Sequence, residues 1–368
     1  MQFIDLSAQL ASMRTAIDRR INAVLDHGQF IMGPEVAELE SQLAEYVGVK
    51  HCISCANGTD ALEIALMSHN IGPGDVVITT AFSFFSTAEV IALVGATPYF
   101  VDIDPITFNL CPNQLELALR TIANENLGHP KAVIAVDLFG LPANYIELEA
   151  LCLSNDLVLI EDAAQGFGGA INGQKAGSFG DISTTSFFPA KPLGCFGDGG
   201  AVFTDNDHVA DKARSIRVHG KGKHKYENVR IGLNSRLDTI QAAILLEKLQ
   251  HFEQELIHRQ AIKEVYQQLS GSWVKPLIPE GYYSSWAQYT LVLEHNSREK
   301  VQAYLKQHDI PSMVYYPIPL NEQPAFTSYR KQSTPIAKKM SQRVLSLPMS
   351  GYLPIDDAQR VVEVLNKI

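Results

Sequence analysis

Apolar runs alternate with helical patterns along the first two-thirds of this 368-residue chain. The runs are nearly continuous in Val, Ile and Leu, and helix-like stretches such as DALEIALMSH and STAEVIALVG lie between them. Strands with this composition are typically covered by helices on both faces of a sheet. The pattern predicts an α/β layered domain with a mostly parallel sheet, and we expect its strands in HCISCA (51–56), DVVITT (75–80), TPYFVDID (97–104), KAVIAVDLFG (131–140), LVLIED (157–162), DISTTSFF (181–188) and GAVFT (200–204).

The pattern changes after Asn234, where residues 236–270 form one long amphipathic stretch. It predicts a helix capped by Asn234 or Ser235, since both residue types are favoured at helix N-termini. We expect this helix to bridge two domains. The predicted division is an N-terminal segment with a large domain over 1–245, and the bridging helix with a small domain over 246–368.

A smaller α/β unit is expected after Gly271. WAQYTLVLE (286–294) has the composition of a strand, and NSREKVQAYLKQHDI (296–310) that of a helix. The pair Asn296 and Glu299 has the spacing of a capping box at the start of that helix.

Composition and charge narrow the function classes. The formal net charge of -10 and the sequence pI of about 5.6 argue against nucleic acid or an anionic membrane surface as the main partner. The N-terminus lacks the basic start and apolar core of a signal peptide. The most apolar window, 76–101, contains Glu89 and Pro98, so we expect strand, helix and strand rather than a membrane span. A cytoplasmic location is expected.

The chain has five cysteines, an odd number that favours reduced thiols. Cys52 and Cys55 match C-x-x-C, but no second pair follows at zinc spacing, and the motif lies in an expected strand. We interpret them as buried, inert thiols and expect no metal site.

Ligands of α/β folds bind beyond the carboxyl ends of parallel strands, and three strand ends here carry unusual groups. The first is NGTDALEIAL, in which Gly58 and Thr59 follow a strand and open a helix. Free N–H groups at a helix N-terminus form a ready phosphate site, and Gly58 would let the backbone approach closely. The alternative is an ordinary N-cap.

The second strand end is LVLIEDAAQ, where Asp162 ends an apolar run and Gln165 follows three residues later. A carboxylate in this position needs a cationic or N–H partner if it is buried. The alternative is that Asp162 caps the segment that follows.

The third is TSFFPAKPLGCFGDGGAVFT, in which Lys191 lies between two prolines and is followed by a glycine-rich run. A buried lysine loses its proton readily, which suits it to covalent chemistry with an aldehyde. The alternative is a lysine whose stem covers Phe187 or Phe188.

Together the three strand ends have the groups that pyridoxal phosphate requires. The phosphate needs N–H donors, the pyridine nitrogen needs a carboxylate, and the aldehyde needs a lysine amine. Phe84, in AFSFFSTAE, ends another strand and could cover the ring, although it could equally be a core phenylalanine.

Six stretches follow one another in the order of the DegT/DnrJ/EryC1/StrS family, which the chain resembles from FIDLSAQ to VLSLPMSGYLP. They are CANGTDALEIAL, TAFSFFSTAEV, FVDIDPITFNL, LIEDAAQGFG, SFFPAKPLGCFGDGGAVFT and IGLNSRLDTIQAAIL. The family comprises pyridoxal-phosphate sugar aminotransferases. The resemblance implies the fold-type I, aspartate aminotransferase-like architecture and a homodimer with shared active sites.

The resemblance also implies roles for individual residues. Lys191 corresponds to the lysine that bonds to the cofactor, and Asp162 to the partner of its ring nitrogen. Asn234 resembles an asparagine that reaches the phosphate from the neighbouring subunit. The remaining expected cofactor-binding residues are the stacking ring Phe84, Gln165 near the phenolic oxygen, and Gly58, Thr59, Asp60 and Ser186 around the phosphate.

FFPAKPLGCFGDGGA resembles the members that aminate C3 of a nucleotide sugar, and in particular those acting on UDP-2-acetamido-2-deoxy-3-oxo-glucuronate in surface-polysaccharide pathways. YYPIPLNEQP (315–324) and RVHGKGKHKY (217–226) resemble that subgroup's substrate loops. Many relatives have His-Tyr-Pro where this chain has Tyr315-Tyr316-Pro317, so the chain departs from the pattern at position 315. The expected substrate-binding residues are His219, Arg236, Tyr315 and Tyr316.

The basic loop could grip a diphosphate or carboxylate, or it could simply be solvated. Its charged members are Arg217, His219, Lys221, Lys223 and Lys225.

The implied reaction is a ping-pong transamination. L-Glutamate leaves its amino group on the cofactor as pyridoxamine phosphate and departs as 2-oxoglutarate, and the ketosugar then takes the amino group. Three alternatives stay open: a dTDP-3-keto-6-deoxyhexose as the substrate, a dehydratase, and a non-catalytic regulator on the same scaffold. Dehydratases of the family carry histidine in place of the lysine, so Lys191 counts against that alternative.

Overall fold

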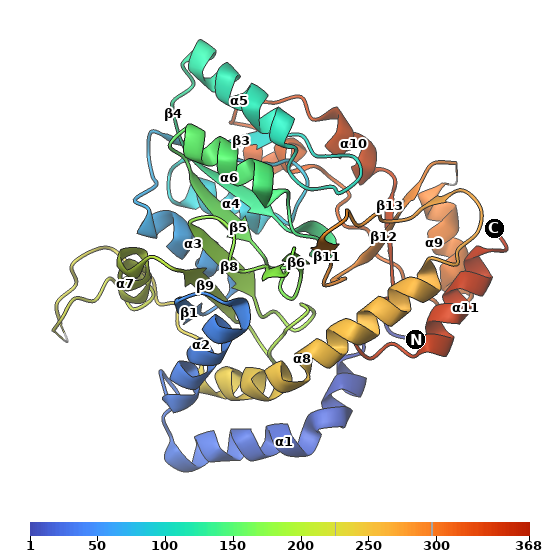
Figure 1. Ribbon diagram of the computed structural model, residues 1–368, viewed down its shortest axis with the longest axis horizontal. Coiled ribbons are helices and arrows are strands. Elements are labelled where there is room, and N and C mark those ends of the chain that lie inside the picture. The colour runs from blue at the N-terminus through green and yellow to red at the C-terminus, as the bar shows by residue number, and fades with distance from the viewer. Residues whose placement is uncertain (225, 296) are drawn as a thin grey trace.

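The computed structural model describes residues 1–224, 226–295 and 297–368. Within them, seven strands form a sheet in which β9 alone runs antiparallel to its neighbours. The expected mostly parallel sheet is therefore confirmed (Figure 1). In spatial order the strands are β1 (His51–Cys55), β9 (Gly200–Thr204), β8 (Ile182–Ser186), β5 (Val158–Asp162), β4 (His129–Val136), β2 (Asp75–Thr80) and β3 (Thr97–Val101).

Helices cover both faces of this sheet because alternate strand residues point to opposite sides. One face packs on α3 (Gly58–Ser68), α4 (Ser86–Leu93) and α7 (Asp207–Ile216). The opposite face packs on α5 (Pro112–Glu125) and α6 (Tyr145–Ser154) over part of its width, and on α2 (Pro34–Val47) and the start of α8 over the rest. Apolar residues on both faces explain the nearly continuous Val, Ile and Leu runs.

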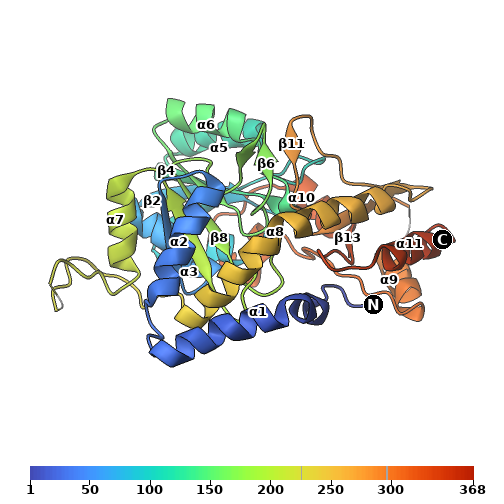
Figure 2. The same cartoon turned by 60° about the horizontal axis from the view of Figure 1, so that its bottom comes forward.

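A smaller antiparallel sheet lies at the other end of the molecule (Figure 1). Its core is shared with the C-terminal end of α8 (Thr239–Tyr266), and α1 (Leu6–His27) lies along α8 in both views (Figure 2). The sheet consists of β10 (Trp273–Val274), β12 (Tyr289–Leu293) and β13 (Val344–Leu347), and the helices around it are α9 (Arg298–Gln307), α10 (Pro335–Ser341) and α11 (Ile355–Leu365). A short ribbon of β6 (Ala170–Ile171), β7 (Gln174–Lys175) and β11 (Tyr282–Tyr283) links the two parts.

The predicted start of the long helix is wrong. α8 begins at Thr239 with Asp238 at its N-cap, whereas Asn234 and Ser235 lie in the extended segment before it. Asn234 forms a bridge with Val218, and the Ser235 hydroxyl accepts from the Ala56 N–H (3.1 Å). These tertiary contacts outweigh the preference of Asn and Ser for helix N-caps.

The helix expected after position 295 is present as α9, and Ser297 caps it by accepting from the Lys300 N–H (3.5 Å). The capping role expected of Asn296 lies outside the described residues. All five cysteines are free thiols. Cys52 and Cys55 are buried in β1, and burial raises the pKa of both thiols, as expected for inert cysteines. Among the described helices, none has the length and apolar character needed to cross a membrane.

Two buried carboxyl groups, Asp137 and Glu161, lie side by side within the strand layer. Glu161 accepts from the N–H groups of Gly177 (2.8 Å) and Phe179 (2.9 Å), and one oxygen of Asp137 accepts from the Tyr145 hydroxyl (2.8 Å). The other oxygen of Asp137 has no partner among the described donors. Burial and the neighbouring Glu161 raise the pKa of Asp137 well above its usual range, and burial raises that of Glu161 to about 7. Asp137 is therefore the carboxyl of this pair that more strongly favours its protonated form.

This proton makes stability depend on pH in a defined direction. The folded protein keeps a proton that unfolded carboxyl groups release above about pH 4. The free energy of unfolding therefore falls as pH rises from about 4 toward 7. Asp137→Asn supplies a permanent donor and removes this dependence. Relative to wild type, the variant should gain up to about 1.4 kcal/mol per pH unit across that window, as measured by urea unfolding. Asp137→Ala, the control, should be destabilised at every pH, and parallel curves for the Asn variant and wild type would contradict the shared proton.

Candidate active site

A cleft of about 740 Å³ opens at the carboxyl ends of β5 and β8, between the large sheet and residues 314–323 of the smaller unit. Most of the expected site residues line it, although they come from five separate segments of the chain. They are Gly58, Thr59, Phe84, Asp162, Gln165, Ser186, Lys191, Tyr315 and Tyr316.

The N-terminus of α3 forms one wall of the cleft. The Asn57 side chain caps the helix by accepting from the Asp60 N–H (2.8 Å), which leaves the first-turn N–H groups of Gly58 and Thr59 for another acceptor. A Cβ at position 58 would lie 2.6 Å from the Ser186 Cβ, so only glycine allows this approach. The ordinary N-cap is confirmed and uses Asn57. Gly58 and Thr59 line the cleft, and their contact with a phosphate stays a prediction. Asp60 does not line the cleft.

Asp162 is buried at the end of β5. One carboxylate oxygen accepts from the Ala164 N–H (3.2 Å) and the other from the Thr87 hydroxyl (3.0 Å). Burial raises the pKa of this carboxyl, while Lys191 and the two hydrogen bonds oppose the rise. Asp162 therefore does cap the segment after it, and it also faces a cation across the cleft.

The loop that carries Lys191 is tightly held. The Lys191 N–H donates to the Phe188 carbonyl (2.8 Å), and the Cys195 N–H donates to the Phe187 carbonyl (2.7 Å). A Cβ at Gly194 would lie 2.6 Å from the Phe188 carbonyl oxygen, so the turn requires glycine. Phe187 is fully buried in the core, whereas Phe188 and the half-buried Lys191 line the cleft. Burial lowers the pKa of the Lys191 amine, and Asp162 raises it.

Gln165 and two aromatic residues complete the wall nearest the smaller unit. The side-chain oxygen of Gln165 (Oε1) accepts from the Phe139 N–H (2.8 Å). The side-chain nitrogen of Gln165 (Nε2) therefore points at the Tyr316 hydroxyl, to which it donates (3.2 Å). Burial raises the pKa of Tyr316, which keeps this hydroxyl protonated at neutral pH. Phe84 is 54% exposed, and its ring centre lies 6.3 Å from that of Tyr316. Phe84 is therefore a cleft residue and not a core phenylalanine.

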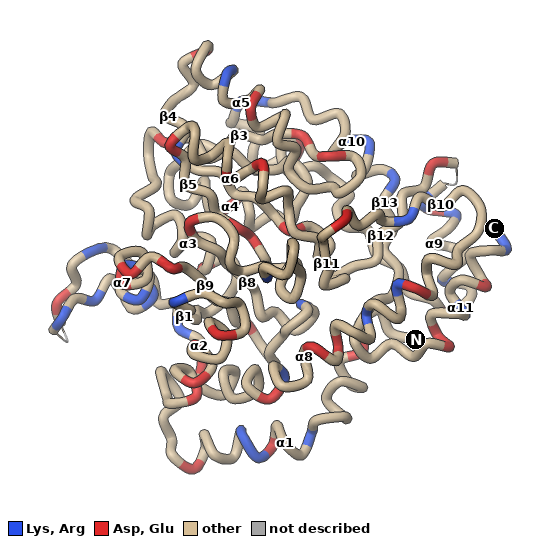
Figure 3. Tube along the Cα trace, in the orientation of Figure 1, with Lys and Arg blue, Asp and Glu red and all other residues tan. Residues whose placement is uncertain are grey.

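Besides Asp60, three expected site residues lie outside this cleft. His219 and Arg236 line a separate cavity of about 460 Å³ beside Arg214, and Asn234 is exposed on the segment that precedes α8. The segment after α7 projects from the body of the molecule (Figure 1) and carries several basic residues (Figure 3).

Arg217 does not belong to a free basic loop. It is buried, pairs with Glu40 and donates to the Ser54 carbonyl (2.8 Å), so it has a structural role. The role expected of Lys225 lies outside the described residues.

The structure adds residues that sequence analysis missed. Thr87 donates to Asp162 from the first turn of α4, Ser83 bonds to Thr87, and Asp198 lines the cleft beside Lys191. The only sequence signal for Thr87 is the run of hydroxyl residues around Phe84 in AFSFFSTAE.

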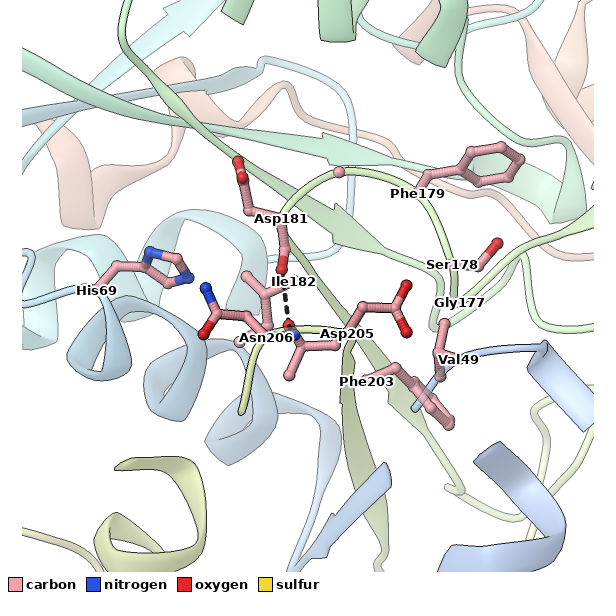
Figure 4. A pocket seen from close by; sticks show the side chains of 12 residues that line it. Val49, His69, Gly177, Ser178, Phe179, Asp181, Ile182, Phe203, Asp205 and Asn206 are labelled. Atoms are coloured by element: carbon pink, nitrogen blue, oxygen red, sulfur yellow. Dashed lines mark hydrogen bonds between the residues drawn. The ribbon is translucent and has the colours of Figure 1, made fainter. Parts of the chain in front are cut away.

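Another cavity, of about 330 Å³, lies at the opposite end of β8 and β9 (Figure 4). His69, Asp181 and Asp205 line it, and it holds none of the expected site residues. The candidate chemistry is thus confined to one edge of the sheet.

Comparison with known proteins identifies this arrangement. Residues 11–366 match the DegT/DnrJ/EryC1/StrS aminotransferase family. The chain belongs to this family. A UDP-2-acetamido-2-deoxy-3-oxo-D-glucuronate aminotransferase from Pseudomonas aeruginosa is 48% identical over 96% of each chain. A pleiotropic regulatory protein from Geobacillus stearothermophilus is 43% identical over 98% of this chain and 96% of its own.

The crystal structure of DesV from S. venezuelae, in complex with a ketimine intermediate, has a TM-score of 0.93 at 32% identity and covers 100% of this chain and 97% of its own. The architecture is that of the fold-type I aminotransferases, as expected. The chain is a pyridoxal-phosphate-dependent sugar transaminase. The cleft fits this cofactor, because it offers free helix N–H groups beside Gly58, a buried carboxylate and a lysine with a lowered pKa.

Lys191 should be the residue that bonds to the cofactor. Treatment of the cofactor-loaded protein with borohydride should attach the cofactor irreversibly, and peptide mapping should find it on Lys191. Lys191→Ala should still take up the cofactor through its phosphate but lose turnover by more than the roughly 10²–10⁴ of a lone acid–base group, because the amine has two tasks. A label on another lysine, such as the nearby buried Lys248, would refute the assignment.

Proposed function

We propose that this transaminase moves an amino group from L-glutamate to C3 of UDP-2-acetamido-2-deoxy-3-oxo-glucuronate, for the synthesis of a surface polysaccharide in the cytoplasm. The observation that carries the proposal is the convergence of Lys191, Asp162 and the α3 N-terminus on one cleft. The substrate is proposed from the relative that shares 48% of its residues over nearly the whole chain.

We propose the following roles for the chain's own residues. The N–H groups of Gly58 and Thr59, with the Ser186 hydroxyl, hold the phosphate. Asp162 holds a proton on the ring nitrogen, and Phe84 covers the ring face. When bound, pyridoxal phosphate supplies an electron-withdrawing ring.

Lys191 is proposed to transfer the proton during the reaction. Its amine would take a proton from the Cα atom of the amino donor and deliver it to C4′ of the cofactor. The lowered pKa of this amine supports the role, because a base must be unprotonated to accept.

The sugar nucleotide is proposed to bind across a homodimer. His219 and Arg236 would reach the partner's cleft beside Tyr315 and Tyr316, and Asn234 would reach the partner's phosphate. Arg236 forms no ion pair with Asp238 among the described residues, and its Nε is buried without a partner. This unpartnered Nε supports a role in binding a ligand, because buried donors are nearly always bonded.

We also propose two domains, residues 1–245 and 246–368. The packing of α8 supports a bridging helix, since its residues up to Leu256 contact the core beneath the large sheet and those from Ile262 onward contact the small one.

Two alternatives remain to be tested. The sugar of a dTDP-3-keto-6-deoxyhexose has no carboxylate, so beyond the diphosphate it would offer the basic cavity around Arg236 no counter-charge. A regulator without catalysis is suggested by the name of the Geobacillus relative. Such a protein would have no need for a lysine and an acid that face each other in a cleft.

The test is a single-turnover assay of the aminated enzyme with a panel of nucleotide ketosugars, followed by the cofactor's absorbance. We expect the acidic UDP sugar to be aminated fastest. If the dTDP sugar, which has no carboxylate, is aminated faster, it becomes the proposed substrate. If the cofactor-loaded protein aminates none of the sugars, the result favours a regulator without catalysis.

Arg236 should select the acidic sugar. Arg236→Lys keeps the charge but loses the two-pronged geometry that matches a carboxylate, so it should weaken the sugar half-reaction by about 1–3 kcal/mol. The glutamate half-reaction should change little. Equal losses in both halves would exclude a role in sugar binding.

Shared active sites predict complementation between two inactive variants. Lys191→Ala and Asn234→Asp damage the same cleft from different chains, so a mixed dimer collects both defects in one site and neither in the other. Mixing them should restore part of the activity. Mixed dimers that form but stay inactive would contradict the shared-site proposal.

A further inference from the structure

The Asp162 carboxylate is held by a residue from a distant part of the chain. Thr87 precedes Asp162 by 75 positions, is fully buried in the first turn of α4, and donates its hydroxyl to one carboxylate oxygen (3.0 Å). The Ser83 hydroxyl lies 3.1 Å from that of Thr87, and Ser83 is also buried. Two hydroxyls thus form a chain that ends on Asp162.

The direction of this chain follows from counting protons. A hydroxyl has one proton to donate, and an ionised carboxylate can only accept. If Asp162 is ionised, Thr87 must donate to it, and Ser83 must then donate to Thr87. Each donor polarises the next, so the pair is a stronger donor to the carboxylate than Thr87 alone.

Thr87 does not make the bond that threonine usually makes in a helix. Such a hydroxyl commonly bonds back to the carbonyl four residues earlier. Thr121 in α5 does so, donating to the Leu117 carbonyl (2.8 Å). Thr87 instead turns toward a carboxylate on the neighbouring strand layer.

We propose that Thr87, supported by Ser83, is a positioning residue that keeps Asp162 ionised and directed at the ring nitrogen of the bound cofactor. The inference rests on the proposed role of Asp162 in this transaminase. It assigns to α4 a part in the chemistry that lies beyond the cleft lining, since Thr87 itself does not line the cleft.

The electrostatic surroundings explain why such support is needed. Burial raises the pKa of Asp162, and the groups that oppose the rise are Lys191, the Ala164 N–H and Thr87. Lys191 changes its bonding during turnover, whereas Thr87 and Ala164 do not. Tyr316 and Tyr145 also lie in the field of Asp162, and their raised pKa values keep them neutral. When Lys191 changes its bonding, the fixed hydrogen bonds from Thr87 and Ala164 are what remain in favour of an ionised Asp162.

The test compares Thr87→Val with wild type by two measurements that do not depend on turnover. The first is the dissociation constant of pyridoxal phosphate, which should rise about 10- to 100-fold, the effect of one hydrogen bond to a charged group. The second is the pH midpoint of the bound cofactor's colour change. This midpoint should move to higher pH. Without the Thr87 hydrogen bond the ring nitrogen of the cofactor is protonated less firmly, so the ring withdraws less electron density from the lysine-bound nitrogen whose titration changes the colour.

Matched variants separate positioning from stability. Thr79→Val removes an equally buried hydroxyl that donates to the Ile134 carbonyl (3.0 Å) without touching Asp162. It should leave both measurements unchanged. Thr87→Ser should restore both values toward wild type, and Ser83→Ala should move both in the direction of Thr87→Val by a smaller amount.

Several outcomes would overturn the inference. In the first, Thr87→Val has the same dissociation constant and pH midpoint as Thr79→Val. In the second, Thr87→Ser is as impaired in both measurements as Thr87→Val. If Thr87→Val does not fold, unchanged values for Ser83→Ala would overturn it. A wild-type protein that takes up no cofactor would instead refute the proposed function itself.

Discussion

In its proposed role the Asp162 carboxylate must stay ionised in a place that water hardly reaches, and its surroundings oppose the cost of burying that charge. A charge at the end of a buried strand is costly unless hydrogen bonds and an opposite charge compensate. Here the compensation comes from three directions, namely Ala164 just after the strand, Thr87 from α4 and Lys191 from the loop after β8. The sheet order brings them together, because β5 and β8 are neighbours and both end at the cleft.

Three carboxyl groups lie close together at the ends of β4 and β5, and their neighbours differ. Asp137 follows β4 directly, and Glu161 and Asp162 are the last two residues of β5. Among the described residues no cation acts on Asp137 and Glu161 to balance two charges, which favours retention of one proton by the pair. Asp162, one residue further along β5, faces Lys191 and two donors, so its charge is supported. Successive residues of one strand point to opposite faces, which allows a protonated pair and an ionised carboxylate to lie within two positions of each other.

Sequence patterns predicted the sheet and the main cleft residues because both depend on local signals. Apolar runs mark strands, and Asp162, Gly58 and Lys191 lie directly at strand ends or in a glycine-rich turn. The predicted start of α8 was wrong, because Asn234 and Ser235 make tertiary contacts although their residue types are favoured at helix N-caps. Thr87 was missed because its partner is 75 residues away, and Arg217 was misjudged because its partner Glu40 lies on α2. Long-range pairings of this kind leave no periodic trace.

The loop around Lys191 reconciles two opposed demands on one side chain. In its proposed roles Lys191 bonds to the cofactor and also carries a proton, so its amine must reach two positions and cannot be locked in place. The backbone can be locked instead, and here it is, through the Phe188 carbonyl, the close contact at Gly194 and the anchor of Phe187 in the core. Prolines on both sides reduce the freedom that the unfolded chain would lose at this point. The Lys191 side chain is only half buried, so the packing that fixes this loop acts on its backbone more than on its amine.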